Sequence, residues 1–272
     1  MDITKNIYDF VFVVLVYKNI QDLKDFFANF KVKNSRVIIV NSFYDKASET
    51  EFSNIAELNN ADFISIPNKG YGFGNNCGCE YALRNYQFQF LVISNADVTI
   101  EKISIDLLDN YRDVIIAPNI YDKKGKKQNP ANPYMSPSWY SYLMYGIFQK
   151  GWRRALIFFS IYSRIAKISF FLLHKFFDKR RIFAAHGAFL IIPKKVLKTL
   201  YPIYDERMFL FCEEPHLGML ARKNNINTYY VPEIIIHHKE DGSMSVANID
   251  IFEKTKESYK IYYNNWIVKN NL

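Results

Sequence analysis

The stretch FVFVVLVY at residues 10–17 is an unbroken run of hydrophobic and mostly β-branched or aromatic residues. A run without polar alternation is typical of a strand buried on both faces, as in a parallel sheet. It is followed by a segment with helical spacing of apolar residues at 19–31, and then by a second buried strand, RVIIVN, at 36–41. The chain therefore begins as a strand–helix–strand unit.

The same alternation continues through the next fifty residues. A helix is predicted at 49–58, with Ser48 as a possible N-cap, and a third strand at 61–67. A glycine-rich loop that starts at Asn68 runs into another helix, and QFLVIS at 89–94 reads as a fourth strand. Alternating strands and helices predict an α/β fold with a mostly parallel central sheet flanked by helices.

The second half of the chain is less regular. A polar, proline-rich loop at 123–133 is expected to be mobile. The remaining elements are predicted as a short helix at 104–111, strands at 113–121, 183–193 and 228–238, a short helix at 194–200, a helix after residue 212, and a terminal helix from Ile249. We expect one domain at 1–248, with a helical insertion at about 136–182, followed by a helical tail at 249–272.

The net charge of +8 is concentrated in one segment of the chain. Nine basic residues and one acid lie between Lys150 and Arg181, so this window alone nets 9 − 1 = +8. The same window is rich in aromatic and aliphatic residues, and the other residues sum to about neutrality. A basic, aromatic segment suits nucleic acid, an anionic membrane surface, or a helix that covers the domain.

Two cations bear on how this segment could contact a membrane. Arg164 and Lys167 interrupt the apolar run, so it contains no uncharged stretch of about 18 residues that would span a membrane. A helix that lies in the membrane interface fits better, because its cations can reach the headgroups. We expect contact with an anionic membrane through residues 139–181 and no nucleic-acid partner; a covering helix is the alternative.

Cysteine content and the N-terminus bear on the compartment. Three cysteines exclude a disulfide framework and a four-cysteine zinc site. The first ten residues include acids and no apolar core of signal-peptide length. We therefore expect a cytoplasmic protein.

Polar features follow three neighbouring strands of the predicted sheet. They are Asn41, the loop of alternate glycines at 68–76, and the triplet Asn95-Ala96-Asp97. Ligands bind at the carboxyl ends of the strands in such sheets, and glycines let a backbone approach a ligand closely. The loop lacks the P-loop pattern GxxxxGK[ST], and a tight strand-to-helix turn is the alternative interpretation.

Three further groups could carry chemistry. Asp97 with Asn95 forms an oxygen-rich site suited to Mg²⁺ or Mn²⁺, unless Asp97 caps a helix. Glu213 and Glu214 follow an aromatic run that could raise a carboxyl pKa and provide a general base, unless both acids face solvent in a first helical turn. The pair His237-His238 ends a strand and could meet a metal or phosphate, or be core histidines.

In this order and spacing, the motifs resemble those of the family 2 glycosyltransferases, particularly the bacterial rhamnosyltransferase-like branch. The match covers roughly residues 10–245 and rests on four stretches: RVIIVNS after the first strand, NKGYGFGNNCG, LVISNADV, and the long run from HGAFLIIPKKVL through YDERMFLFCEEPHLGMLARKNNINTYYVPEIIIHHKEDGS.

The resemblance implies a GT-A fold, with a Rossmann-like nucleotide-binding half, and inverting transfer from a UDP- or dTDP-linked sugar. By position, Asp97 and His238 would bind the divalent ion, Mg²⁺ or Mn²⁺. Glu214 would be the general base, with Glu213 as the alternative. The residues that would line the nucleotide are Tyr17, Asn41, Asn68, Gly70, Tyr71, Gly72, Phe73, Asn76 and Asn95.

Two positions depart from the family pattern. The family often has Asp near position 41, where this chain has Asn41, and its later acid in the Glu-Asp-x-Asp helix is His216 here.

The implied acceptor is a hydroxyl of a glycan or of a polyprenyl-diphosphate-linked oligosaccharide in capsule or O-antigen synthesis. The enzyme would be peripheral on the inner face of the plasma membrane. The competing interpretations are a sugar-nucleotide nucleotidyltransferase, whose glycine loop usually follows the first strand, and a non-catalytic membrane-surface binding protein.

Overall fold

The computed structural model describes residues 7–177, 180–239 and 250–269. Within them one sheet has the order β3-β2-β1-β4-β8-β6-β9-β5, with β7 paired to β9. The strands are β1 (Ile7–Val16), β2 (Ser35–Ser42), β3 (Asp62–Ile66), β4 (Gln87–Asn95), β5 (Val98–Lys102), β6 (Ile115–Asp122), β7 (Arg181–Ile182), β8 (Phe189–Pro193) and β9 (Thr228–His238).

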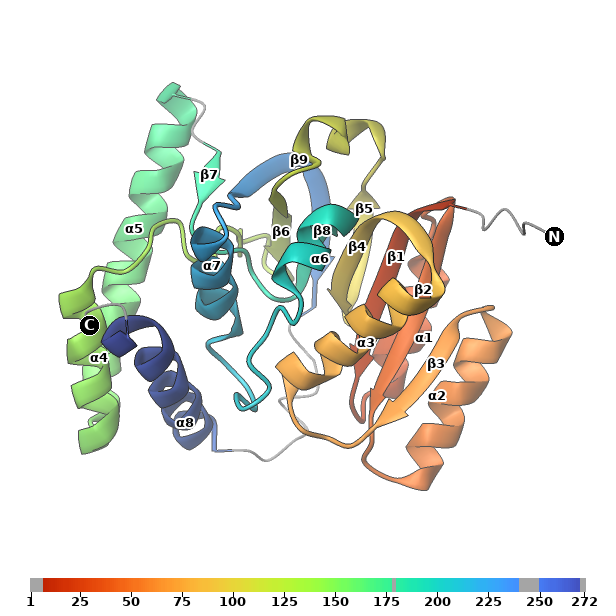
Figure 1. Cartoon of the computed structure of the whole chain (residues 1–272), viewed down its shortest axis with the longest axis horizontal. Coiled ribbons are helices and arrows are strands. Elements are labelled where there is room, and N and C mark those ends of the chain that lie inside the picture. The colour runs from red at the N-terminus through yellow and green to blue at the C-terminus, as the bar shows by residue number, and fades with distance from the viewer. Residues whose placement is uncertain (1–6, 178–179, 240–249, 270–272) are drawn as a thin grey trace.

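Helices connect and cover these strands (Figure 1). They are α1 (Ile20–Asn29), α2 (Lys46–Leu58), α3 (Tyr71–Asn85), α4 (Ser138–Lys150), α5 (Leu156–Phe177), α6 (Lys194–Leu200), α7 (Glu213–Lys223) and α8 (Ile251–Tyr263), with short 3-10 helices at Asp106–Tyr111 and Arg153–Ala155 and a π-helical turn at Asn264–Val268.

The sheet is parallel on one side and mixed on the other. Strands β3, β2, β1 and β4 are mutually parallel, whereas β8 runs antiparallel to both β4 and β6. Beyond β8, β6 and β9 pair in parallel and β5 pairs antiparallel to β9. The predicted α/β class is thus confirmed, and the parallel pairing inferred from the strand–helix alternation holds for the first four strands.

Each face of the sheet has its own hydrophobic core. Helices α1 and α2 contribute Leu23, Phe26 and Phe52 to the core on one face. Helices α3, α6 and α7 cover the other face, and Phe170 of α5 joins that second core. Burial on both faces explains why β1, β2 and β4 are continuous apolar runs.

The segment between β6 and β7 contains α4 and α5, which lie together at one side of the molecule (Figure 1). Helix α8 packs on α4 through Phe148, Phe252 and Tyr259. The tail helix begins at Ile251, and the predicted domain boundary at 248–249 falls outside the described residues. Within the described residues, one helical stretch, Arg153–Lys175, is long and apolar enough to cross a membrane by length and composition.

Several local expectations are corrected by the structure. The glycine segment is mostly helical, because α3 already begins at Tyr71. Asp45, whose carboxylate accepts from the Ser48 backbone N–H at 2.8 Å, is the N-cap of α2 in place of Ser48. Asp97 caps no helix at 104–110, since β5 follows it directly. The sequence did not predict β5, which pairs with the predicted strand β9.

Two connecting segments also differ from expectation. The strand predicted at 183–193 is regular only from Phe189, and the residues before it form an irregular segment. The loop predicted to be mobile is packed in its second half, since Gln128 and Asn129 are buried and the Asn129 amide donates to Pro118 O at 2.9 Å.

Gly70 lies at a close contact between two main-chain segments, the start of α3 and the segment before α7. It has φ +104° and ψ 176°, a region that essentially only glycine occupies. A Cβ atom at Gly70 would lie 2.0 Å from the carbonyl oxygen of Phe209. The next residue, Tyr71, donates its backbone N–H to that same oxygen at 2.9 Å.

Gly70→Ala should therefore destabilise the protein strongly. Both the backbone strain and the clash with main-chain atoms of Phe209 oppose the substitution, so we expect a loss of about 3 kcal/mol or more. Gly125→Ala is the matched control, because Gly125 also has positive φ (+74°) but no atom lies within 4 Å of its added Cβ. Thermal unfolding of both variants measures the difference, and equal losses would contradict the close approach at Gly70.

Candidate active site

A pocket of about 620 Å³ lies at the carboxyl ends of β1 and β4. Its size is in the range of small-molecule and cofactor sites. From β1 the chain proceeds outward to β2 and β3 and then returns to place β4 on the other side of β1. Ligands of open α/β sheets bind at such reversals, because the loops after the two central strands leave in opposite directions.

Asp97 and His238 meet in this pocket although they are far apart in the sequence. Both are buried, and Asp97 Oδ1 lies 3.3 Å from His238 Nε2. The other ring nitrogen, Nδ1, lies 2.9 Å from the side-chain oxygen of Gln128. A carbonyl oxygen only accepts, so Nδ1–H donates to Gln128 and Nε2 is the ring nitrogen that faces Asp97.

The arrangement brings a ring nitrogen and a carboxylate oxygen together. A neutral imidazole nitrogen and a carboxylate oxygen at this separation are suited to bind one divalent cation. No group of three or more Cys, His, Asp or Glu side chains that could hold a metal occurs among the residues the structure describes. The two side chains therefore fit Mg²⁺ or Mn²⁺ held jointly with substrate phosphates, as is common for these ions.

Glu213 and Glu214 begin α7 and both line the pocket. Glu214 is half-buried, and its Oε1 accepts the backbone N–H of Gly187 at 3.0 Å. Glu213 is buried, its Oε1 has no hydrogen-bond partner, and desolvation raises its pKa to about 8. The two adjacent acids thus differ: Glu214 has an oriented carboxylate, and Glu213 holds its proton near neutral pH.

A strained turn aims these acids at the pocket. The two preceding residues, Phe211 and Cys212, have φ +72° and +68°. Residues other than glycine in the left-handed region cost about 1–3 kcal/mol each, and such strain concentrates at functional sites. The turn directly precedes α7, whose first two residues, Glu213 and Glu214, line the pocket.

A hydrogen-bonded chain links the two sides of the pocket. The Tyr71 hydroxyl donates to the carbonyl oxygen of Gly187 at 2.7 Å, and the N–H of Gly187 is bound to Glu214. A Cβ atom at Gly187 would contact both the Tyr71 hydroxyl and Glu214 Oε1, each at 3.5 Å. The start of α3 therefore positions the acid at the start of α7.

Nine of the predicted site residues border the pocket: Tyr17, Asn68, Gly70, Tyr71, Asn95, Asp97, Glu213, Glu214 and His238. His237 points away from this pocket, is exposed, and pairs with Glu101 at 2.5 Å.

The other four predicted residues lie outside the lining. Asn41 is buried and donates to Ser65 Oγ at 3.1 Å. Gly72 packs beneath Tyr204, and Asn76 clamps the same residue by accepting from its N–H and donating to its carbonyl. Phe73 lies under the Lys69 ammonium.

Other lining residues were not anticipated from the sequence. Asp22 of α1, Gln128 and His186 belong to this group. Asp22 occupies an ordinary first-turn position and Gln128 a loop position, so neither has a sequence signal. His186 lies next to the predicted Gly-Ala-Phe stretch, which could have indicated it.

His216, at the position of the family's later acid, does not line the pocket. It is buried, and its Nδ1 accepts from the Trp266 indole N–H at 3.0 Å. Desolvation lowers its pKa to about 4. This residue therefore anchors the C-terminal segment to α7.

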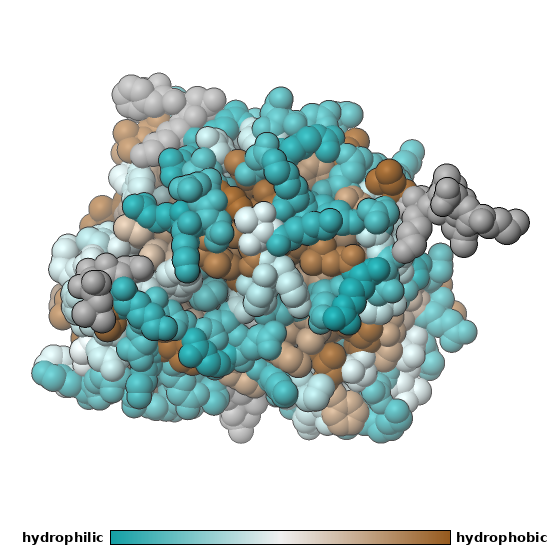
Figure 2. All heavy atoms as spheres, in the orientation of Figure 1, coloured by the Kyte–Doolittle hydropathy of each residue, from teal (hydrophilic) through white to brown (hydrophobic). Residues whose placement is uncertain are grey.

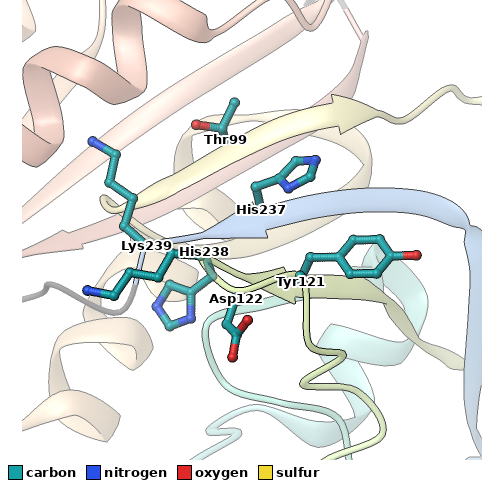
Figure 3. Close-up of a pocket in the computed structure, with 8 residues that line it drawn as sticks. Thr99, Tyr121, Asp122, His237, His238 and Lys239 are labelled. Atoms are coloured by element: carbon teal, nitrogen blue, oxygen red, sulfur yellow. The ribbon is translucent and has the colours of Figure 1, made fainter.

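A second, more open hollow of about 410 Å³ adjoins the pocket at His238 (Figure 3). His238 and Asp122 point to one side of their strands, whereas His237 and Tyr121 turn the other way, with their rings stacked at 5.8 Å. Lys123 and Lys239 line its cationic side.

The chain resembles known proteins in sequence and in fold. No family model matches the chain. It is 22% identical over 271 residues to the low-salt glycan biosynthesis hexosyltransferase Agl10 of Haloferax volcanii, covering 97% of this chain and 76% of the relative.

Solved structures share the fold. One is GalNAc-T7 with UDP, GalNAc and Mn²⁺ (TM-score 0.55, 12% identity, 88% of this chain and 44% of that chain). Another is residues 1–349 of S. aureus TarS with UDP-GlcNAc (TM-score 0.51, 11% identity, 89% of this chain and 62% of that chain). The chain thus spans about half of the first of these and three fifths of the second. The fold is that of the GT-A glycosyltransferases.

The buried acid predicts a specific pH dependence of stability. Glu213 has a folded-state pKa raised above its unfolded value of 4.5, so its neutral form stabilises the fold below pH 4.5, and this contribution is lost as pH rises toward 8. Glu213→Gln cannot ionise and should become more stable relative to wild type between pH 5 and pH 8. Denaturant unfolding across this range measures it, and a constant difference would contradict the assignment.

Gln128→Leu should weaken Mn²⁺ binding about 10–100-fold, because His238 loses the partner that fixes its protonated nitrogen. Titration of Mn²⁺ in the presence of UDP, followed by electron paramagnetic resonance, measures the affinity. Gln21→Leu on the exposed face of α1 is the control. Unchanged affinity in a folded Gln128→Leu protein would show that Gln128 does not orient His238.

Proposed function

We propose that this protein is an inverting glycosyltransferase that moves a hexosyl or deoxyhexosyl group from a nucleotide-diphosphate sugar to an acceptor hydroxyl. The observation that carries the proposal is the meeting of Asp97, His238 and Glu214 in one pocket at the strand reversal of a GT-A fold. The glycan-related name of the Haloferax relative and the UDP-sugar complexes of the structural neighbours support it.

The donor would lie along the carboxyl ends of β1 and β4. Tyr17 and Asn68 border the pocket where a nucleotide would enter, and the Tyr17 ring packs edge-on against Tyr44 to form an aromatic rim. The diphosphate would lie toward Asp97 and His238. A Mg²⁺ or Mn²⁺ ion bound there would neutralise charge that develops on the leaving diphosphate.

Glu214 is the proposed general base. Its Oε1 is held by Gly187, so the carboxylate has a fixed direction and its second oxygen can take the acceptor proton. Glu213 is less suited to this step at neutral pH, because burial keeps it protonated. A single displacement by an acceptor oxygen deprotonated at Glu214 inverts the anomeric centre.

We further propose the rhamnosyltransferase-like branch, a UDP- or dTDP-linked donor, and a glycan or polyprenyl-diphosphate-linked acceptor in bacterial capsule or O-antigen synthesis. An acceptor held in a membrane requires the enzyme to reach the bilayer, so we place it on the cytoplasmic face of the plasma membrane. The basic, aromatic composition of residues 139–181 supports this location.

The function is tested first by donor binding and then by sugar transfer. We expect UDP- or dTDP-sugars with Mn²⁺ to raise the melting temperature and GDP-sugars to have less effect. Glu214→Gln should keep this shift and lose about 10²–10⁴-fold in kcat. Transfer is followed with radiolabelled donor, and NMR of the product gives the anomeric configuration.

Glu257→Gln, an exposed acid on α8, is the matched control for the loss of one carboxylate. Absence of any shift with nucleotide sugars would favour the non-catalytic binding interpretation. Near-normal transfer by Glu214→Gln would move the base to another residue.

A further inference from the structure

The outer surface of α5 carries a continuous apolar stripe. Its members are exposed and recur at helical spacing: Ile157, Phe158, Ile161, Ile165, Ile168 and Leu172. At 100° per residue these positions fall within about one third of the helix circumference. In Figure 2 a few hydrophobic side chains are visible at the upper left of the molecule.

Two tryptophans extend the stripe beyond α5. Trp139 of α4 is 60% exposed and packs edge-on against Tyr162 of α5, and Trp152 in the turn between the helices is 56% exposed. Amphipathic aromatic rings favour the level of the lipid headgroups. A contiguous apolar patch of this kind on a monomer marks an interaction surface.

Cations without acidic partners surround the stripe. Arg153 and Arg180 are paired, with Asp250 at 2.9 Å and Glu233 at 2.8 Å. Among the other exposed cations of the segment, four have neither an ion pair nor a contact with an aromatic ring within the described part of the chain: Arg154, Arg164, Lys175 and Arg181. An apolar stripe bordered by unpaired cations complements an anionic bilayer better than a second protein, whose interface core would be depleted of charge.

The inner face of α5 fixes the direction of the helix. Phe159 and Phe170, eleven residues apart, are both buried against the protein, the first on Tyr140 and the second on Tyr134 and Tyr230. At 1.5 Å per residue this attachment extends over about 16 Å of helix.

Polar contacts reinforce that attachment. Lys167, between the two phenylalanines, donates to the carbonyl oxygen of Gln128 at 3.1 Å. If α5 spanned the membrane, the polar groups attached to it, including Lys167 and the loop at Gln128, would enter the hydrocarbon core. Polar and charged groups are costly to place there.

We propose that α5 is an interfacial helix that docks the enzyme on an anionic lipid bilayer with its axis in the membrane plane. The apolar stripe enters the headgroup–acyl boundary, Trp139 and Trp152 lie at headgroup level, and the four cations bind anionic headgroups. This docking mode rests on the proposed membrane-bound acceptor for its purpose, but lipid binding can be measured without any sugar transfer.

Flotation with liposomes of phosphatidylcholine containing about one third phosphatidylserine tests the docking. We expect the full chain to float, and Ile161→Gln/Ile165→Gln/Ile168→Gln to lose at least about 10-fold in partitioning, because glutamine keeps helix propensity and removes apolar burial. Leu58→Gln, at the most exposed apolar residue of α2, is the matched control.

Charge is tested separately from the apolar stripe. Replacing Arg154, Arg164, Lys175 and Arg181 by alanine should weaken binding to anionic liposomes about 10-fold or more and abolish its salt dependence. The control carries alanine at four exposed lysines outside the segment, Lys31, Lys33, Lys102 and Lys198, and so has the same net charge.

Orientation is read from accessibility at the two ends of α5. Single Arg154→Cys and Lys175→Cys proteins bound to sealed liposomes should both react with a membrane-impermeant maleimide, relative to the wild-type background. Quenching of tryptophan fluorescence by brominated lipids should be reduced in Trp139→Phe/Trp152→Phe.

Three results would overturn the proposal. They are protection of one labelled end, which indicates a spanning helix; absence of flotation; and lipid-free self-association that the glutamine variant abolishes, which assigns the stripe to a second copy of this chain. If flotation succeeds and nucleotide sugars have no effect, the proposed transferase activity fails and the docking surface stands.

Discussion

The contact between the main chain of Gly70 and the carbonyl of Phe209 is the constraint on which the pocket depends. It joins the amino end of α3, in the parallel half of the sheet, to the segment that leads into α7. No side chain fits between these two backbones. The close approach brings Tyr71 within reach of Gly187, and through Gly187 it fixes the carboxylate of Glu214.

The electrostatics of the pocket follow from unequal burial. Asp97 and His238 Nε2 face each other, and Gln128 accepts a hydrogen bond from the other ring nitrogen of His238. Glu213 and Glu214 are adjacent in the sequence. Glu213 Oε1 is buried without a hydrogen-bond partner, whereas Glu214 Oε1 accepts a backbone N–H. Different environments thus give two identical side chains different chemistry: Glu213 holds its proton near neutral pH, and Glu214 has a carboxyl group of fixed direction.

The insertion between β6 and β7 connects this pocket to the outer surface. Helix α5 presents apolar residues outward, while Lys167 on its inner side binds the main chain of Gln128. The residue that orients His238 is thereby held by the same helix that carries the exposed stripe. The net charge of the whole chain is a property of this one segment.

The sequence by itself determined the strand–helix alternation, the GT-A class and the candidate residues Asp97, Glu213, Glu214 and His238. Unbroken apolar runs and polar residues at strand ends are local patterns, so they can be recognised in the sequence alone. Tertiary structure decided which candidates share a pocket, because that depends on strand order and on contacts between distant residues. Gln128 and His186 enter the pocket through loops without any periodic pattern, whereas Asn41 and Asn76 turn into the protein to satisfy buried polar groups. Burial on only one face of α5 likewise follows from packing on Tyr134, Tyr140 and Tyr230, which no spacing within the helix reveals.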